Sequence, residues 1–445
     1  MAYSGPTGNG GNGGVVEDFR PTRNPLPWHL LPDAAAVGDG GNLTIGGCDT
    51  LELAAEFGTP LFVYDEEHLR ARCREAVAAF GSQAIYATKA FLCRAMARLA
   101  HEEGMGLDAA TGGELHVCLS AGVPADRIVF HGNNKSLPEL KLGRNVGVGR
   151  TVVDSFDELD RLETLFQRDG QRPKVLLRIT PGVRAETHEY VATGQDDSKF
   201  GFTVSTGAAL AAVERARASD AMELVGIHAH IGSQVFRVDS FSAACQVLGD
   251  FANPLGLPEL IIGGGLGVPY VEGEEGATIT QWASVIQKAM ADAGVSARIG
   301  IEPGRAITAA AAVTLYSVGT VKDLPGIRTY VAVDGGMSDN PRPVLYGSGY
   351  EAFLPRAVEA PRPRQVRIVG KHCESGDLLV RNASVPDDIR VGDIVATPVT
   401  GAYGHSMGSN YNKVLRPPVV FCRDGDARLV VRRERYDDLL ITDEG

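Results

Sequence analysis

Lys89 is the residue whose place in the sequence most directly suggests chemistry. It follows the short apolar run Ala84–Thr88, and residues 91–100 after it have helical periodicity. A lysine at the end of a buried strand is desolvated, which disfavours its ammonium form and leaves an amine that can attack a carbonyl. Taken alone, this stretch favours an ordinary surface lysine, because most lysines are exposed, so the assignment depends on other residues.

A glycine run, Gly263-Gly264-Gly265-Leu266-Gly267, follows another apolar stretch. Consecutive glycines leave backbone N–H groups free to bind a phosphate, although glycine runs also form plain turns. The run lacks the GxGxxG spacing of a dinucleotide site and the GK[ST] ending of a P-loop. A single phosphate therefore fits it better than a dinucleotide.

The segment Glu302-Pro303-Gly304-Arg305 follows a third apolar stretch. Its carboxylate could hold a protonated ring nitrogen, and Arg305 could bind a phosphate or carboxylate; an ion pair beside a turn is the alternative. With Lys89 and the glycines, it completes the three groups that pyridoxal phosphate requires: a lysine for the aldehyde, a phosphate cradle and a carboxylate for the pyridinium.

Two histidines, His228 and His230, are separated by one residue. On a strand, side chains at this spacing point to opposite faces, so the pair cannot chelate one metal ion without a bend in the backbone. We therefore predict no metal site. One of the two could stack on an aromatic cofactor, and His228 is expected to be an ordinary core histidine.

The segment from Gly370 to Asp377 contains a thiol, two carboxylates and a turn glycine. A buried free cysteine is usually inert, but Cys373 is flanked by His372 and Glu374, which makes it a candidate proton donor. It lies in a different predicted domain from Lys89. It must therefore reach the site by domain packing or from a second subunit.

The elements that must position these residues alternate between short strands and helices. Eight strands are predicted, each followed by polar or glycine-rich residues: Ala84–Thr88, Gly106-Leu107, Ile128–Phe130, Thr151–Val153, Lys174–Ile179, Leu224–Ile227, Glu259–Ile262 and Arg298–Ile301. This α/β alternation predicts a (β/α)₈ barrel with its site at the C-terminal strand ends. An open doubly wound sheet would not place function at all eight ends.

After Arg305 the chain consists mainly of β-branched runs between proline and glycine turns, which predicts a mostly antiparallel β-domain. The runs are Val313–Val321, Thr329–Val333, Gln365–Val369, Asp393–Val399 and Ala427–Arg432. We predict a disordered N-terminal tail (1–27), a segment (28–60) whose strand 43–45 contributes to the β-domain, a barrel (61–309) and the C-terminal β-domain (310–445).

The composition excludes several classes of partner. The chain has 445 residues and a net charge of −12, which disfavours nucleic acid and anionic membranes as partners. It has no apolar run near the ~20 residues of a membrane span and no secretory signal. Its seven cysteines are scattered, without CxxC or CxxH spacing, so we expect no disulfides or zinc and a cytoplasmic protein.

Taken together, these motifs resemble the barrel-type (fold type III) pyridoxal-phosphate-dependent decarboxylases, and within them the diaminopimelate decarboxylase family. The resemblance covers the chain from about Leu61 to Leu440. It is based on Tyr86–Ala90, Thr111–Leu115, His131–Lys135, His230–Gln234, Gly263–Gly267, Glu302–Arg305, Cys373–Asp377 and Gly401–Tyr403.

The resemblance implies pyridoxal 5'-phosphate as cofactor, bound to Lys89 as a Schiff base, with His230 stacked on its ring and Glu302 paired with its ring nitrogen. The implied cofactor-binding residues are Lys89, Asp108, His230, Ser233, Gly264, Gly265, Glu302, Pro303, Gly304, Arg305 and Tyr403. The implied catalytic residues are Lys89, His230 and Cys373.

The resemblance also implies decarboxylation of meso-2,6-diaminopimelate to L-lysine by a homodimer with shared active sites. Arg305, Arg342, Tyr346, Glu374 and Tyr403 are the implied substrate-binding residues. Cys373 of the partner subunit would protonate the quinonoid carbon, and Glu374 of the partner subunit would bind the distal ammonium. Bidentate arginine–carboxylate pairs and a carboxylate for the far amine suit such a substrate.

Three alternatives remain open. Gly404-His405 and Gly408-Ser409-Asn410 depart from the family pattern after Tyr403, so the substrate could be lysine, ornithine or a precursor of a specialised metabolite. An amino-acid racemase of the same fold would need a second base facing Lys89 and would leave Cys373-Glu374 unexplained. A non-enzymatic relative would be expected to have lost Lys89, Glu302 or Cys373, and all three are present.

Overall fold

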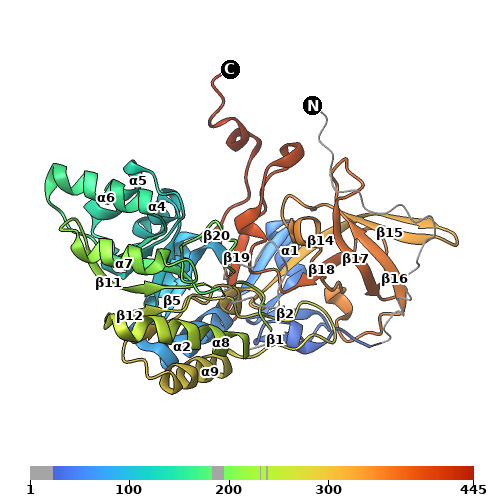
Figure 1. Cartoon of the computed structure of the whole chain (residues 1–445). Coiled ribbons are helices and arrows are strands. Elements are labelled where there is room, and N and C mark those ends of the chain that lie inside the picture. The colour runs from blue at the N-terminus through green and yellow to red at the C-terminus, as the bar shows by residue number, and fades with distance from the viewer. Residues whose placement is uncertain (1–23, 183–194, 231, 237–238) are drawn as a thin grey trace, which may run out of the picture.

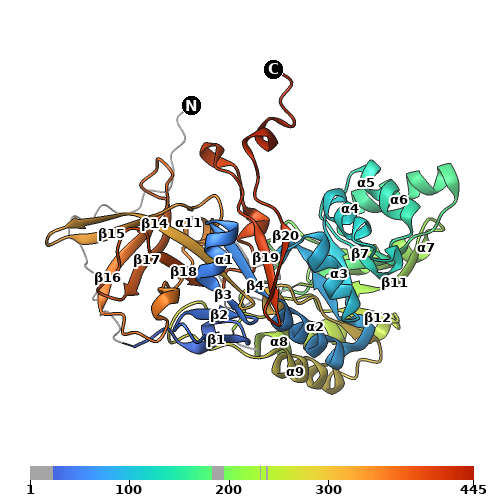
Figure 2. The same ribbon diagram turned by 180° about the vertical axis from the view of Figure 1, so that it is seen from behind.

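The computed structural model describes residues 24–182, 195–230, 232–236 and 239–445. Most of the predicted N-terminal tail, and Ile231 in the motif after His230, lie outside these residues. Figures 1 and 2 show a helix-covered barrel on one side of the molecule and a β-rich domain on the other, with strands β19 (Val419–Arg423) and β20 (Asp426–Val431) between them.

Eight parallel strands form the barrel, and they confirm the predicted (β/α)₈ fold. They are β5 (Ile85–Ala87), β6 (Gly106–Ala109), β7 (Ile128–Phe130), β8 (Arg150–Val153), β9 (Lys174–Thr180), β11 (Glu223–His228), β12 (Glu259–Ile261) and β13 (Arg298–Gly300). A short strand, β10 (Phe202–Thr203), also pairs with β9. The barrel closes where the Ile85 N–H donates to the Ile301 carbonyl at 2.9 Å.

Helices surround the strands on the outside of the barrel (Figure 1). They are α2 (Glu66–Phe80), α3 (Arg94–Glu102), α4 (Gly112–Ser120), α5 (Leu137–Val146), α6 (Phe156–Asp169), α7 (Ala208–Ala218), α8 (Asp239–Ala252) and α9 (Ile279–Asp292). Side-chain caps begin several of them, as with Ser136, which accepts from the Glu139 N–H and forms a capping box at α5. Among the described residues, no helix has the length and apolar character of a membrane span.

The barrel interior changes from apolar to polar along the strands. Its apolar layer consists of Ile85, Val129, Val152, Leu176, Val225 and Ile261. Side chains two residues apart on a strand point to the same face, so the layer above contains His131 after Val129, Asp154 after Val152 and Arg178 after Leu176. The chain therefore buries a polar layer at the C-terminal mouth of the barrel.

The second domain is a sheet with strand order β17-β16-β15-β14-β4-β19-β20, and β18 also pairs with β14. The bounds not yet given are β4 (Leu61–Asp65), β14 (Ala312–Leu324), β15 (Arg328–Val333), β16 (Arg364–Val369), β17 (Leu378–Val385) and β18 (Ile394–Pro398). Only the pairs β15–β16 and β4–β19 are parallel in this sheet, so the prediction of a mostly antiparallel β-domain is confirmed. Strand β4, which we assigned to the barrel, pairs here instead.

The N-terminal segment contributes to this domain by packing. Strands β1 (Ala35–Val37), β2 (Leu43–Ile45) and β3 (Cys48–Asp49) form their own small sheet, followed by helix α1 (Thr50–Phe57). Leu43 and Ile45 are fully buried in the same hydrophobic core as Leu315 of β14. The strand predicted near 43–45 therefore lies against the β-domain without joining its sheet.

Candidate active site

Most of the predicted cofactor residues line one cavity at the C-terminal mouth of the barrel. This cavity, of about 340 Å³ including its opening, is lined by Lys89, His230, Ser233, Gly265, Glu302, Pro303, Gly304, Arg305 and Tyr403, together with three apolar side chains. A neighbouring cavity of about 670 Å³ is also lined by Lys89, Ser233, Arg305 and Tyr403, and adds Gln234, Arg342, Tyr346, Ser348 and Met407. Residues far apart in sequence thus converge on Lys89.

Lys89 lies in a short 3₁₀ turn (Thr88–Ala90) directly after β5, and its side chain lines the open cavity. Our expectation that desolvation lowers its pKa is wrong for this structure. Burial does favour the neutral amine, but Tyr403, Asp108 and Glu302 act in the opposite direction, and the pKa is raised. Since a phenol is uncharged at neutral pH, the two carboxylates are the neighbours that stabilise the ammonium there.

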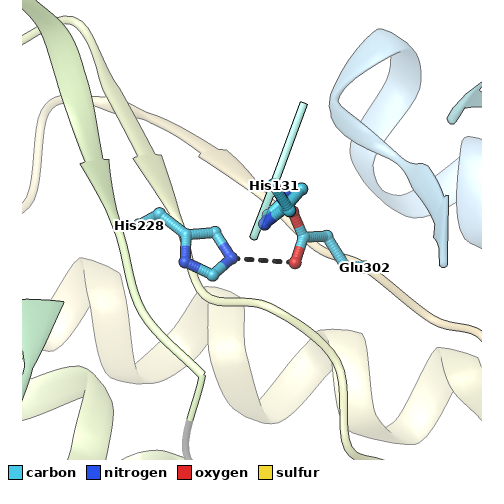
Figure 3. Close-up of side chains that lie close together, drawn as sticks. All are labelled: His131, His228 and Glu302. Carbon is cyan, nitrogen blue, oxygen red and sulfur yellow. Dashed lines mark hydrogen bonds and ion pairs between the residues drawn. The ribbon is translucent and has the colours of Figure 1, made fainter. Parts of the chain in front are cut away.

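Glu302 is held by two histidines that sequence reasoning did not assign to it. Its Oε2 lies 2.8 Å from His228 Nε2, and its Oε1 lies 2.9 Å from His131 Nε2. Figure 3 shows the three side chains pointing toward one another from different strand ends. Burial opposes its charge, but the two histidines outweigh this and hold the pKa of Glu302 well below its usual range, so the carboxylate is ionised.

The other buried acid of the site is Asp108, in β6. Its Oδ1 accepts from the Thr88 N–H at 2.9 Å, which ties β6 to the turn that carries Lys89. Burial raises the pKa of Asp108 to about 6, although His131 and Lys89 act to lower it. Asp108 therefore supports the turn that carries Lys89, although it does not itself line either cavity.

The glycine run brings strand ends into close contact. A Cβ on Gly264 would lie 2.1 Å from the Glu302 carbonyl oxygen. Gly265 has φ +113°, and a Cβ there would lie 2.2 Å from the Gly232 carbonyl oxygen. Both positions require glycine, so this run is more than a plain turn, and its backbone is accessible at the cavity through Gly265.

Two arginines and two tyrosines form a connected group beside Lys89. Arg305 donates to Ser233 Oγ at 2.9 Å and to the Tyr270 hydroxyl at 2.6 Å. The Arg342 guanidinium lies 4.3 Å from the Tyr270 ring centroid and donates to the Tyr350 hydroxyl at 2.5 Å. Both arginines are buried, which places two fixed cations where carboxylates could bind.

Cys373 and Glu374 lie apart from this group. Both residues are exposed, and neither lines the two cavities beside Lys89 of its own chain. Their hairpin is anchored by His372, whose Nε2 is 2.9 Å from Ser338 Oγ, and the Tyr411 hydroxyl donates to Glu374. Within one chain, the structure therefore does not bring the predicted proton donor to Lys89.

The departure at Gly404-His405 has a packing explanation. The His405 ring lies edge-on to Phe62 and Phe91, with centroid distances of 5.8 and 5.7 Å, and does not line either cavity. Burial lowers the pKa of His405 to about 4, so the ring is neutral. The next residue of this loop that lines a cavity is Met407.

Four functional candidates were missed from the sequence: His131, His228, Tyr270 and Tyr350. His131 belongs to a motif that we quoted without a role, and His228 was expected to be an ordinary core residue. Both histidines end or follow barrel strands, which was the available signal. The tyrosines lie in loops, and no periodic pattern marks them.

Comparisons with known proteins agree with this geometry. Residues 66–309 match the family model of the pyridoxal-binding domain of pyridoxal-dependent decarboxylases. The diaminopimelate decarboxylase of Mycobacterium tuberculosis is 48% identical over 421 residues, covering 90% of this chain and 94% of that protein. The Bacillus subtilis diaminopimelate decarboxylase is 44% identical over 419 residues, covering 91% and 95%.

Solved structures give the same relationship. Diaminopimelate decarboxylase from M. jannaschi superposes with a TM-score of 0.86 at 32% identity, covering 93% of this chain and 98% of that one. The Helicobacter pylori diaminopimelate decarboxylase in complex with L-lysine gives a TM-score of 0.81 at 31% identity, covering 88% and 98%. The chain therefore belongs to the diaminopimelate decarboxylase family and is a carboxy-lyase that uses pyridoxal 5'-phosphate.

Proposed function

We propose that this enzyme converts meso-2,6-diaminopimelate to L-lysine and CO₂, as a homodimer whose two active sites each use residues of both subunits. The observation that carries the proposal is the pair of buried guanidinium groups, of Arg305 and Arg342, that lines one cavity with Lys89. The names of the relatives, and the L-lysine in the H. pylori complex, support the same substrate.

The residues of the first cavity fit pyridoxal 5'-phosphate. Lys89 supplies an amine for the aldehyde, and Glu302 supplies a buried carboxylate for the ring nitrogen. The Gly265 backbone, which lines this cavity, suits a phosphate, with Ser233 and Arg305 beside it, while the Gly264 N–H donates to His230 Nδ1 at 3.2 Å. When bound, the cofactor supplies an electron sink for the electron pair that remains when a carboxylate carbon leaves.

The second cavity suits the carboxylate groups of an amino dicarboxylate. Arg342 is fixed by the Tyr270 ring and the Tyr350 hydroxyl, so little side-chain freedom remains to be lost on binding. A guanidinium can bind a carboxylate through two parallel hydrogen bonds, which also fixes its orientation. Arg342 would therefore bind the carboxylate that is retained, with Tyr346 beside it on the cavity wall.

The proposed reaction needs a proton donor for the product carbon, and Cys373 lines neither cavity beside Lys89 of its own chain. Decarboxylation breaks the bond between the α-carbon and its carboxylate carbon, CO₂ leaves, and the α-carbon takes a proton in its place. The exposed Cys373 thiol is an available donor on the surface of a second subunit. Glu374 beside it offers the negative charge that a distal ammonium requires.

A screen of CO₂ release tests the substrate. We expect release from meso-diaminopimelate at least about tenfold faster, at equal concentration, than from lysine, ornithine, arginine or glutamate, since unmatched buried charges cost the other substrates binding energy. Preferred release from any of these four amino acids would refute the proposed substrate, while leaving the enzyme a decarboxylase.

Subunit mixing tests the shared site. Lys89→Ala and Cys373→Ala homodimers should each lose most activity, and a mixture of the two should recover part of it. In a random mixture about half of the molecules are heterodimers, each with one intact site, so about a quarter of wild-type activity is the expected ceiling. If mass spectrometry detects heterodimers but the mixture recovers no activity, the proposal that the two subunits share each active site is refuted.

A further inference from the structure

The two histidines around Glu302 are not used by the proposed reaction, yet both are buried. His228 ends β11 and is 1% exposed, and His131 follows β7 and is 7% exposed. Their rings meet edge-on at a centroid distance of 4.8 Å. Glu302 Oε1 lies 2.9 Å from His131 Nε2, and Oε2 lies 2.8 Å from His228 Nε2, the contact marked in Figure 3.

This arrangement determines how the protons are placed. An ionised carboxylate can only accept hydrogen bonds, so His228 must carry its proton on Nε2 to donate to Glu302 Oε2. His131 Nε2 approaches the other oxygen, Oε1, to 2.9 Å. A carboxylate offers about four lone-pair positions, and His228 uses one of them. Glu302 also lines the cavity that contains Lys89, so lone pairs remain available to a donor inside that cavity.

The charge of the group is as important as its geometry. Burial lowers the pKa of His228 to about 4, although Glu302 acts to raise it, so His228 donates as a neutral ring. An arginine or lysine in its place would have cancelled the charge of Glu302. Arg178, the arginine of this polar layer, is instead directed at Asp154, 3.8 Å away. Glu302 therefore keeps most of its negative charge for a group in the cavity.

We propose that His131 and His228 are positioning residues that hold Glu302 aimed at the cofactor's ring nitrogen, with its charge undiminished, so that this nitrogen stays protonated. The inference rests on the placement of Glu302 against the ring proposed above. Neither histidine contacts the reacting atoms in this scheme. Each acts through the carboxylate.

The same three side chains offer a competing chemistry. Their ligand atoms all lie within 4.8 Å of one another, a spacing from which His₂Glu sites bind zinc. Two observations favour direct pairing: His228 Nε2 and Glu302 Oε2 are already hydrogen-bonded, and the other oxygen lies 2.9 Å from His131 Nε2. Equilibrium dialysis of the apoenzyme against Zn²⁺ should find no stoichiometric ion; one ion per chain, lost in both His131→Leu and His228→Leu, would overturn the proposal.

The direct readout is the protonation state of the ring nitrogen, measured without turnover. Holoenzyme reconstituted with ¹⁵N-ring-labelled pyridoxal phosphate should give a protonated-nitrogen chemical shift from pH 6 to 9. The His131→Leu/His228→Leu variant should shift toward the unprotonated value at the upper end of this range. Gln at either position retains an N–H near the Nε2 site and should restore most of the shift, which a purely structural role would not predict.

Steady-state kinetics should show the same pattern. We expect kcat of the double Leu variant to fall about 10- to 100-fold, the range typical when a partner that orients a functional ligand is removed, with KM nearly unchanged. His68→Gln is the matched control, because His68 also binds a carboxylate, Asp33, but lies outside both cavities. It should behave as wild type.

The Glu302→Gln variant distinguishes the role of Glu302 at the ring nitrogen from the positioning role of the two histidines. If this variant keeps a protonated ring nitrogen, the placement of Glu302 against the ring fails. If Glu302→Gln loses the proton while the double Leu variant, folded by thermal melting, keeps it up to pH 9, the positioning role of the histidines is refuted and the proposed function stands.

Discussion

Replacing Arg342 tests the substrate cavity most selectively. Arg342 is 5% exposed and begins the short helix α11 (Arg342–Tyr346). Methionine has a similar length and can keep the packing against Tyr270, so Arg342→Met removes the guanidinium with little loss of volume. Arg342 does not line the first cavity, which contains Glu302 and Gly265, so cofactor binding should be unaffected.

The expected magnitude follows from the contacts. A buried guanidinium–carboxylate pair that loses one partner costs about 2–4 kcal/mol, which corresponds to about a 30- to 1,000-fold fall in kcat/KM. Tyr350→Phe removes only the hydroxyl that holds Arg342 at 2.5 Å, so we expect about 1 kcal/mol, or about a fivefold fall. Arg342→Lys should lie between the two variants, because lysine keeps the charge but cannot form two parallel hydrogen bonds.

The assay is CO₂ release from meso-diaminopimelate, with the visible absorption band of the holoenzyme as a check on cofactor content. Arg356→Met is a suitable control, because Arg356 also pairs with carboxylates, Asp388 and Asp393, but lies in the β-domain away from both cavities. A kcat/KM within threefold of wild type in Arg342→Met would refute the assignment of Arg342 to the substrate.

Three further outcomes follow from the packing. In urea unfolding, Gly265→Ala should lower the free energy of unfolding by about 2–3 kcal/mol, because its Cβ would meet the Gly232 oxygen. The control is Gly273→Ala, where φ is also positive but no atom lies near the added Cβ, and it should lower the free energy of unfolding by only about 1 kcal/mol. Lys135→Met should lower the free energy of unfolding by about 3–5 kcal/mol, because Glu158 stays buried without the ammonium that lies 2.8 Å from it. Adding Glu158→Gln to this variant removes the unpaired charge and should restore part of the lost stability. His405 has a folded-state pKa of about 4, below the unfolded value of about 6.5, so its contribution of about 3 kcal/mol is present above pH 6.5 and lost as the pH falls toward 4. His405→Phe should flatten that part of the stability–pH curve; an unchanged slope would contradict the buried neutral ring.

The barrel could be predicted from the sequence because its signal is local. Each strand is a short apolar run, and each is followed by a helix with a recognisable start, such as Ser136 before α5. The β-domain was harder. Strands β17 and β19 were missed, and β4 was assigned to the barrel, because strand pairing is determined by contacts distant in sequence, such as that between Val63 and Val420.

The active site was predictable to the extent that its residues follow strands directly. Lys89, Gly265 and Glu302 could be found in this way, and they do line one cavity. The pairing of Glu302 with His131 and His228 could not, since it depends on which interior side chains meet across the barrel. The charge state of Lys89 was predicted wrongly because desolvation alone was considered: Asp108 and Glu302 were assigned to the same site, but their effect on the pKa of Lys89 was not.

The most direct test of the account is to locate the lysine that carries the cofactor. Holoenzyme treated with borohydride, digested and analysed by mass spectrometry should show the pyridoxyl group on the peptide that contains Lys89, and Lys89→Ala should lack both this adduct and the visible absorption band. An adduct on any other lysine of the wild-type chain, or none in active holoenzyme, would contradict the central claim that Lys89 holds the cofactor at the mouth of the barrel.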